Sequence, residues 1–297
     1  MEQNTKLLDI HACPLCAGDN FIHFLNTKDF FFTQEDFSLY KCADCNFVFT
    51  NPVPTSISKY YETPDYLSHN TNGKGALAWL YYLLREINIK RKYQLVTKYC
   101  KQGNILDIGC GTGELLNFFK KNNWLALGVE PNLTAREFAA NKYLIDVFEE
   151  NKLDEFDHGT LDVISMWHVL EHVPDLHRRL SKVSKLLKDD GTIFIAVPNI
   201  DSPDSKKYKK YWSALDVPRH LYHFTPATFE HLISKHQLKL VHAEPMKFDS
   251  YYVSMLSEKY LKNRLYFLSA SYYGYLSNLK AKRNNNYSSM IFVVKKD

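Results

Sequence analysis

The sequence lacks any apolar run long enough to cross a membrane. Its longest clean apolar stretch, residues 77–84, is far shorter than the roughly 20 residues that a membrane-spanning helix needs. The first residues also lack the charged segment followed by an apolar segment that is typical of a secretory signal peptide. We therefore expect a soluble, cytoplasmic protein with no transmembrane segment.

The sequence also lacks a strong charge imbalance. Lys and Arg total 37 and Asp and Glu total 33, so the formal net charge is only +4. Proteins that bind nucleic acid usually carry a dense basic stripe, and this composition argues against one. With 297 residues, 45% hydrophobic and 24% charged, the chain has the composition of a globular protein with one large domain, or one large and one small domain.

Cysteine is scarce, and the six cysteines are unevenly distributed. Four of them form two Cys-X-X-Cys pairs, which are Cys13 with Cys16 and Cys42 with Cys45. In a chain without a secretory signal, such pairs favour metal over disulfides, and four thiolates form the closed tetrahedral site of structural zinc. Because so small a module buries little core, the metal would hold it together. The aromatic segments 30–32 and 37–40 between the pairs predict a hairpin.

Glycine is also scarce, yet Gly109, Gly111 and Gly113 alternate within one short segment. Residues 105–108 before them are apolar and β-branched, which predicts a buried strand, and helical spacing resumes after them. A strand that turns into a helix through glycines brings backbone N–H groups close to a ligand. Asp107 would repel a pyrophosphate but would hold an ammonium group. The Gly-X-Gly-X-Gly spacing differs from the dinucleotide fingerprint, which disfavours a nicotinamide oxidoreductase.

With the segments that follow, this loop resembles motif I of the class I S-adenosylmethionine-dependent methyltransferases, over about residues 80–245. Residues 125–130 are similar to the family's second strand, whose final acid, here Glu130, accepts the ribose hydroxyls. Residues 162–172 are similar to the fourth strand and its outgoing turn, which implies that Trp167 and His168 lie beside the methionine half of the cofactor. The residues implied to hold the methionine end itself are Asp107, Gly109, Gly111 and Gly113.

The fold that the resemblance implies is α/β, with a Rossmann-like seven-stranded, mostly parallel sheet and helices on both faces, plus the small zinc module. The expected regions are a zinc-ribbon-like module (1–52), a linker and helical region (53–100), and a cofactor-binding domain (101–297) with a helical insertion (248–287) between its last two strands. The expected strands cover residues 105–108, 125–130, 143–148, 161–166, 192–197, 238–243 and 289–294.

Helices are expected over residues 76–100, over 175–188, and from a capping box at Thr134 and Glu137 onward. We interpret the basic face of the first of these helices as solvated; its residues are Arg85, Lys90, Arg91 and Lys92. In the family, a polar residue after the third strand commonly meets the adenine amine. The candidates, which the sequence leaves open, are Asp146, Glu149 and Glu150.

The segment 212–224 follows the fifth strand, at the edge where open α/β sheets bind ligands. It places His220, Tyr222 and His223 next to Arg219. A histidine with a pKa near neutrality suits removal of a proton from a hydroxyl or an activated carbon. We interpret His223 or His220 as the general base, with Tyr222 and Arg219 orienting the acceptor. In the competing interpretation, one of the two histidines only holds the loop, as we expect of His172 beneath the next helix.

The insertion 248–287 is rich in tyrosine and leucine and predicts two amphipathic helices. The simplest interpretation is packing against the domain or against a second subunit, so a monomer and a homodimer both remain open. A lid over an apolar or lipid-linked acceptor is the alternative.

The predicted function is S-adenosylmethionine-dependent O- or C-methylation of a small-molecule acceptor, such as a sugar, a glycan or a secondary metabolite. The zinc module is similar to that of sugar-nucleotide C-methyltransferases, although their large additional carboxy-terminal domain has no counterpart in these 297 residues. The alternative is a nucleic-acid-directed methyltransferase or a zinc-ribbon nucleic-acid-binding protein. Against it, no Asp/Asn-Pro-Pro-Tyr/Phe sequence follows the fourth strand, and no Pro-Cys nucleophile motif is present.

Overall fold

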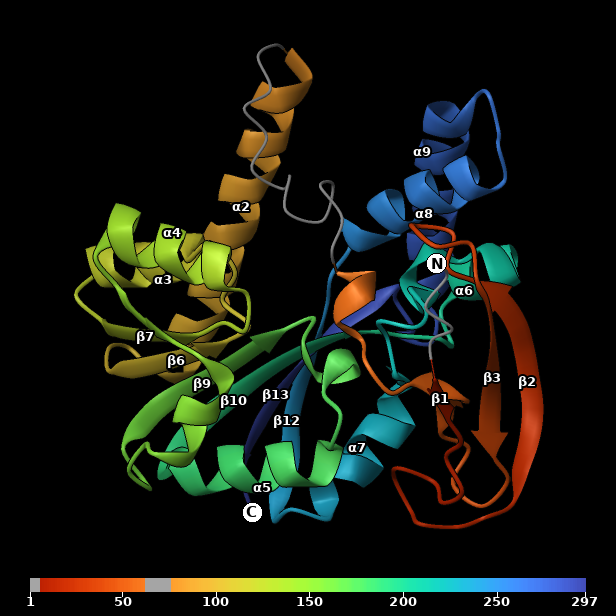
Figure 1. Cartoon of the computed structure of the whole chain (residues 1–297). Coiled ribbons are helices and arrows are strands. Elements are labelled where there is room, and N and C mark those ends of the chain that lie inside the picture. The colour runs from red at the N-terminus through yellow and green to blue at the C-terminus, as the bar shows by residue number, and fades with distance from the viewer. Residues whose placement is uncertain (1–5, 62–75) are drawn as a thin grey trace.

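The computed structural model describes residues 6–61 and 76–297, and a seven-stranded sheet forms its centre (Figure 1). The strands are β6 (Asn104–Ile108), β7 (Leu125–Val129), β8 (Asp146–Phe148), β9 (Leu161–Trp167), β10 (Leu187–Pro198), β12 (Leu238–Pro245) and β13 (Ser289–Lys296). Their order across the sheet is β12-β13-β10-β9-β6-β7-β8. Neighbours are parallel except where β13 pairs antiparallel with β10 and β12. The predicted fold class is confirmed.

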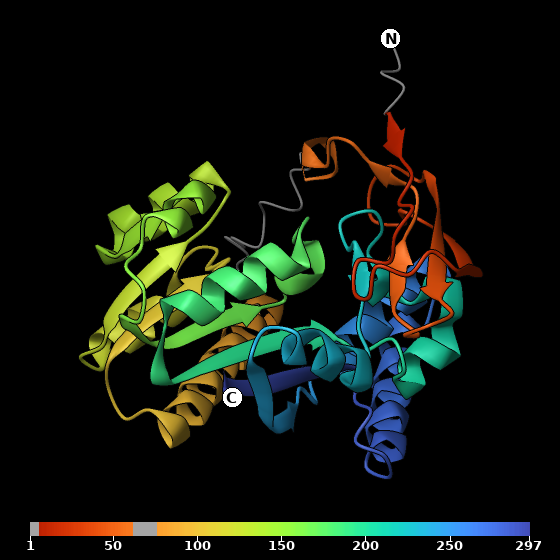
Figure 2. The same cartoon turned by 90° about the horizontal axis from the view of Figure 1, so that it is seen from below.

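Helices cover both faces of this sheet (Figures 1 and 2). They are α2 (Ala76–Tyr99), α3 (Glu114–Lys121), α4 (Leu133–Tyr143), α5 (Leu176–Leu186) and α7 (Pro226–Ser234). Because side chains alternate along a strand, Ile193 and Ile195 of β10 pack in the core with α5 and α7, whereas Phe194 packs with α2 and α3. Both faces are apolar for that reason, as a mostly parallel sheet requires.

Several element boundaries differ from the sequence prediction. The helix α4 begins at Leu133 rather than Thr134, because the side chain of Asn132 accepts a hydrogen bond from the backbone N–H of Ala135 at 2.9 Å. It also continues through Tyr143, so β8 is shorter than the predicted third strand. The helix predicted over 175–188 ends earlier, at Leu186, and residues 187–191 lie inside β10, at an irregularity in its pairing with β9 between Leu187 and Thr192.

The amino-terminal module is a second, four-stranded sheet with the order β11-β4-β3-β2. Its strands are β2 (Phe21–Lys28), β3 (Asp36–Cys42), β4 (Val48–Thr50) and β11 (Tyr222–His223), and a separate short pair joins β1 (Leu7–Leu8) to β5 (Val53–Pro54). The predicted hairpin exists as β2 and β3, but residues 30–32 form its turn rather than a strand, since β2 ends at Lys28. Strand β11 comes from the larger domain, so the two regions share one sheet.

The insertion before β13 forms α8 (Asp249–Tyr260) and α9 (Tyr266–Ala281), which stand away from the central sheet in Figures 1 and 2. The short helix α6 (Pro203–Tyr208) packs beside them. Within residues 6–61 and 76–297, no helix combines the length and apolarity needed to cross a membrane.

Candidate active site and metal centre

The glycine loop between β6 and α3 has the backbone that its sequence predicts. Gly109, Gly111 and Gly113 have φ angles of +73°, +54° and +78°, in the region that glycine adopts most easily. A Cβ at Gly109 would lie 2.4 Å from Cγ2 of Val169, so this position also needs glycine for space. A Cβ at Gly111 would meet nothing within 4 Å. The loop therefore packs closely at Gly109 and leaves open space at Gly111, as a cradle for a ligand would.

Glu130 lies in front of this loop, immediately after β7. One carboxylate oxygen accepts a hydrogen bond from the N–H of Gly111 and the other accepts one from the N–H of Asn132, both at 2.9 Å. Burial raises the pKa of Glu130, and the two N–H donors partly offset that rise. The carboxylate is held in a fixed orientation beside the loop without any ligand.

Asp107 is buried at the end of β6. It accepts a hydrogen bond of 2.5 Å from the hydroxyl of Ser165, and burial raises its pKa to about 6. The ammonium of Lys92, on α2, lies 4.3 Å from the ring centroid of Trp167 and interacts with Asp107. The predicted solvation of the basic face of α2 is therefore wrong for Lys92, and also for Arg85, which forms an ion pair with Glu114.

His168, in the turn after β9, lies between two carboxylates. Its φ is +58°, its Nδ1 lies 3.3 Å from Glu171 and its Nε2 lies 3.3 Å from Asp249. Burial acts to lower the pKa of His168, but the contacts with Asp249 and Glu171 raise it to about 9. His168 is therefore a cation at neutral pH and a hydrogen-bond donor rather than a base.

Glu171, His172 and His220 form a buried cluster next to His168. Their ligand atoms lie within 4.8 Å of one another, and apart from the ring of His168, no described group donates a hydrogen bond to either oxygen of Glu171. The Nδ1 atoms of His172 and His220 lie 3.0 and 2.9 Å from the carbonyl oxygens of Arg219 and Ala214. A carbonyl only accepts, so each Nδ1 carries the proton and each Nε2 is left as an acceptor.

The cluster has the chemistry of a proton acceptor. Nε2 of His220 lies 4.0 Å from Glu171. Burial and the neighbouring His220 lower the pKa of His172 to about 4, so His172 is neutral near pH 7. An oxygen and two imidazole nitrogens are also a donor set that a divalent cation accepts.

The other two predicted catalytic residues lie in the module's sheet, because β11 pairs with β4. The hydroxyl of Tyr222 donates to the carbonyl of Pro174 at 2.8 Å. Nε2 of His223 lies 3.3 Å from the hydroxyl of Thr50, and burial lowers the pKa of His223 to about 3. The structure therefore separates His220, which faces Glu171, from Tyr222 and His223, which face the amino-terminal module.

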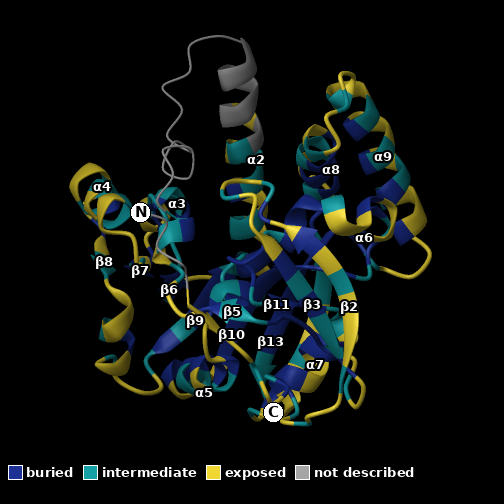
Figure 3. Ribbon diagram, turned by 45° about the vertical axis from the view of Figure 1, so that its right-hand side comes forward, coloured by how far each residue is buried: buried dark blue, intermediate teal, exposed yellow. Residues whose placement is uncertain are grey.

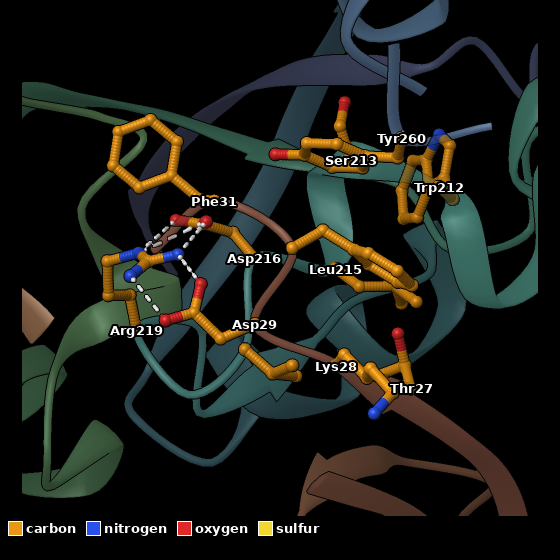
Figure 4. A pocket seen from close by; sticks show the side chains of 12 residues that line it. Thr27, Lys28, Asp29, Phe31, Trp212, Ser213, Leu215, Asp216, Arg219 and Tyr260 are labelled. Atoms are coloured by element: carbon orange, nitrogen blue, oxygen red, sulfur yellow. Dashed lines mark hydrogen bonds and ion pairs between the residues drawn. The ribbon is translucent and has the colours of Figure 1, made fainter. Parts of the chain in front are cut away.

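Arg219, expected to orient the acceptor, is instead 1% exposed at the junction of the two regions (Figure 4). Its guanidinium lies 2.8 Å from Asp29 and 2.7 Å from Asp216 and donates to the carbonyl of Tyr60 at 3.1 Å. Burial acts to lower the pKa of Arg219, but the carboxylates of Asp216 and Asp29 raise it. The expectation that Arg219 binds an acceptor is wrong, because its donors are already used within the protein.

Sequence reasoning also missed several residues of the site. Glu171 lies in the segment 162–172 but was not among the predicted site residues. Asp249 lies in the insertion 248–287, far from that segment in sequence. All three adenine candidates are exposed, and Glu150 forms an ion pair with Arg179.

The four paired cysteines converge in the amino-terminal module. Their sulfur atoms lie within 4.8 Å of one another, and two cross pairs, Cys13 with Cys45 and Cys16 with Cys42, are 3.6 Å apart. A disulfide needs about 2.05 Å, whereas sulfurs bound tetrahedrally at about 2.3 Å from zinc lie roughly 3.8 Å apart. The distances therefore fit four thiolate ligands around one zinc ion.

The two Cys-X-X-Cys turns have the same backbone. The N–H of Ala17 donates to the carbonyl of Cys13 at 2.9 Å, and the N–H of Asn46 donates to the carbonyl of Cys42 at 3.0 Å. Ala17 and Asn46 have φ angles of +65° and +63°. Two copies of one turn facing each other aim four sulfurs at a single point, which a closed structural zinc site requires.

Comparisons with known proteins identify relatives of the larger domain. A family model for a methyltransferase domain matches residues 81–243. A ubiquinone biosynthesis O-methyltransferase of Glaesserella parasuis is 31% identical over 106 residues, which are 32% of this chain and 45% of that protein. An uncharacterized protein of Methanocaldococcus jannaschii is 37% identical over 110 residues, 36% of this chain and 42% of that protein. The chain spans less than half the length of both relatives.

Solved structures share the fold. A methyltransferase of Archaeoglobus fulgidus, described as dependent on S-adenosylmethionine, has a TM-score of 0.51 at 22% identity, over 73% of this chain and 99% of that one. The geranyl diphosphate C-methyltransferase of Streptomyces coelicolor, solved with S-adenosylhomocysteine, has a TM-score of 0.50 at 16% identity, over 70% of this chain and 79% of that one.

Proposed function

Because this chain belongs to the methyltransferase family, we propose that it transfers a methyl group from S-adenosylmethionine to a small-molecule acceptor. The observation that carries the proposal is the glycine loop, open at Gly111, with Glu130 fixed in front of it. The loop leaves open space at Gly111, and each carboxylate oxygen of Glu130, which already accepts one backbone N–H, keeps acceptor capacity for a ribose hydroxyl of an adenosyl group.

Different residues hold different parts of the cofactor. Glu130 accepts the ribose hydroxyls, and Asp107, with the loop of Gly109, Gly111 and Gly113, holds the methionine end. Trp167 is the last residue of β9 and His168 follows it, and both lie beside that end. The cofactor supplies a methyl group on a sulfonium that is ready for in-line displacement, so the protein contributes mainly by alignment.

The acceptor gives up a proton as it takes the methyl group. We assign the base to His220, whose Nε2 accepts the proton while Glu171, 4.0 Å away, stabilises the imidazolium that forms. We favour a hydroxyl group over a carbon atom as the acceptor, because the relative from Glaesserella parasuis is named as an O-methyltransferase. A sugar, a glycan or a secondary metabolite fits this chemistry. Tyr222 and His223 instead keep the loop of His220 attached to the amino-terminal module.

The cofactor assignment predicts selective stabilisation by S-adenosylhomocysteine. At a hundredfold excess over its dissociation constant, a ligand that binds only the folded protein adds about 2.7 kcal/mol of stability. We expect a thermal-shift titration to show this effect with S-adenosylhomocysteine and none with NAD. Glu130→Ala should weaken the effect, whereas Glu137→Ala, an exposed position on α4, should not. Stabilisation by NAD alone would overturn the cofactor assignment.

The base assignment predicts different losses at two neighbouring histidines. We expect His220→Ala to lower kcat by about a hundredfold, with S-adenosylhomocysteine binding unchanged. His223→Ala should instead lower the melting temperature and leave the kcat of the folded fraction intact. Turnover is measured as S-adenosylhomocysteine release after a screen of hydroxyl-bearing sugars and phenols. Unchanged turnover in His220→Ala, with cofactor binding retained, would contradict the role of His220 but not the cofactor site.

A further inference from the structure

The helix α9 buries its small residues and exposes its large apolar ones, which is the reverse of an ordinary surface helix. Its buried residues are small and recur at helical spacing: Ala270, Gly274, Ser277 and Ala281. Gly274 faces α8, where the hydroxyl of Ser250 donates to its carbonyl at 3.1 Å, and Ser277 donates to Asp204 of α6 at 2.7 Å. A Cβ at Gly274 would lie 2.9 Å from Cα of Tyr251, so the two backbones are in close contact. A surface helix normally turns its large apolar side chains toward the core.

The large apolar residues of α9 are exposed instead, and exposed positions recur along α9 in Figure 3. The exposed positions repeat the buried spacing two residues earlier in the chain; they are Leu268, Tyr272, Tyr275 and Leu279, between 46% and 66% exposed. Two residues correspond to about 200° of rotation, so this face is opposite the one on α8. Leu265 and Phe267, 64% and 57% exposed, extend it toward the turn between the helices. We call these six residues the outer face of α9.

The charged residues of the segment that contains this face are mostly basic. The segment 248–287 contains six basic and two acidic residues, and its net charge of +4 equals that of the whole chain. All six basic residues are exposed, and none forms an ion pair with a described residue; they are Lys259, Lys262, Arg264, Lys280, Lys282 and Arg283. Both acids point inward: Asp249 contacts His168, and Glu258 accepts hydrogen bonds from Tyr208 and Asn263.

We propose that the outer face of α9 docks this protein on an anionic lipid surface. Leucine, phenylalanine and tyrosine side chains would enter the boundary between headgroups and acyl chains, where tyrosine is favoured, while lysine and arginine contact the anionic headgroups. With 16 residues, α9 is only about 24 Å long and therefore lies along the surface rather than across the bilayer. Small residues at the α8–α9 contact also allow close helix packing without large apolar side chains.

Charge decides against a second copy of this chain as the occupant. In a two-fold dimer through this face, the six basic residues of one copy would lie near those of the other. No exposed acid in the segment 248–287 would compensate them. The basic residues lie in two groups, one before α9 begins and one at its carboxy-terminal end. Anionic headgroups complement both groups, and each basic residue near such a surface adds about fivefold to binding.

The test is co-sedimentation of the full chain with vesicles of phosphatidylcholine alone and of phosphatidylcholine containing phosphatidylglycerol. We expect binding to the second kind, weakening at high ionic strength. Two double variants should each reduce binding about tenfold or more; they are Leu268→Ser/Leu279→Ser and Lys280→Glu/Lys282→Glu. The matched controls are Leu133→Ser/Leu144→Ser for exposed apolar residues, and Lys98→Glu/Lys101→Glu for an equal charge change elsewhere.

Circular dichroism melting shows whether each variant is folded, and only variants with the parent's melting temperature are compared. Equal binding by the α9 variants and their controls would overturn the proposal, as would absence of binding to the anionic vesicles. A concentration-dependent dimer in sedimentation velocity, lost in Leu268→Ser/Leu279→Ser and accompanied by no vesicle binding, would assign the face to a second copy instead.

Discussion

Replacement of Arg219 by alanine is expected to lower the free energy of unfolding by about 3–5 kcal/mol, because it leaves the buried carboxylate of Asp29 and the partly buried one of Asp216 without their partner. Asp29 is 1% exposed, and it belongs to the amino-terminal module, whereas Asp216 belongs to the larger domain. The guanidinium contacts both, and the ring of Phe31 lies 5.0 Å away (Figure 4). The measurement is urea unfolding of the full chain, followed by tryptophan fluorescence.

An exposed ion pair of the same chemistry serves as the control. Arg178 lies 2.9 Å from Asp154, and the two side chains are 74% and 58% exposed. Arg178→Ala should change stability by only about 0–1 kcal/mol. Arg219→Lys should be intermediate, since one ammonium cannot replace a fork of donors toward two carboxylates and the carbonyl of Tyr60. A loss below 1 kcal/mol in Arg219→Ala would show that this junction does not hold the two regions together.

The central sheet and the cofactor loop could be predicted because their signals are local. Three of the four residues 105–108 are apolar in sequence, and the glycines that follow adopt positive φ angles. The same holds for the cysteine turns, in which Ala17 and Asn46 repeat one short backbone motif. Local chemistry determines these features, so sequence reading reaches them.

The junction could not be predicted because its partners are distant in sequence. Asp29 and Arg219 are 190 residues apart, and His223 is 173 residues from Thr50. In sequence, Arg219, His220, Tyr222 and His223 form one polar cluster, which favoured a single catalytic role. In the fold, Tyr222 and His223 become a two-residue strand of the other region's sheet, and only His220 turns toward Glu171.

Loss of the proposed zinc ion is expected to abolish turnover while S-adenosylhomocysteine still binds. Structural zinc sites in small modules contribute apparent binding free energies of about 10–16 kcal/mol, so the module should unfold without its metal. Strand β4 would be lost with it, and β11, which pairs with β4, would be released. His220 lies two residues before β11 and would lose its position, whereas the glycine loop and Glu130 belong to the other sheet.

The experiment compares Cys42→Ser with Cys100→Ser. Cys42 is 0% exposed at the end of β3 and is one of the four converging thiols, whereas Cys100 lies outside that group. We expect about one zinc ion per chain by atomic emission in the parent and in Cys100→Ser, and a large loss of metal and turnover in Cys42→Ser. Thermal shift with S-adenosylhomocysteine should remain in both variants. Metal and melting temperature equal to the parent's in Cys42→Ser would contradict the zinc site, and loss of cofactor binding would show that the two sheets are not independent. Loss of metal and turnover with cofactor binding retained would separate the module's part, which is to position His220, from the part of the loop that holds the cofactor.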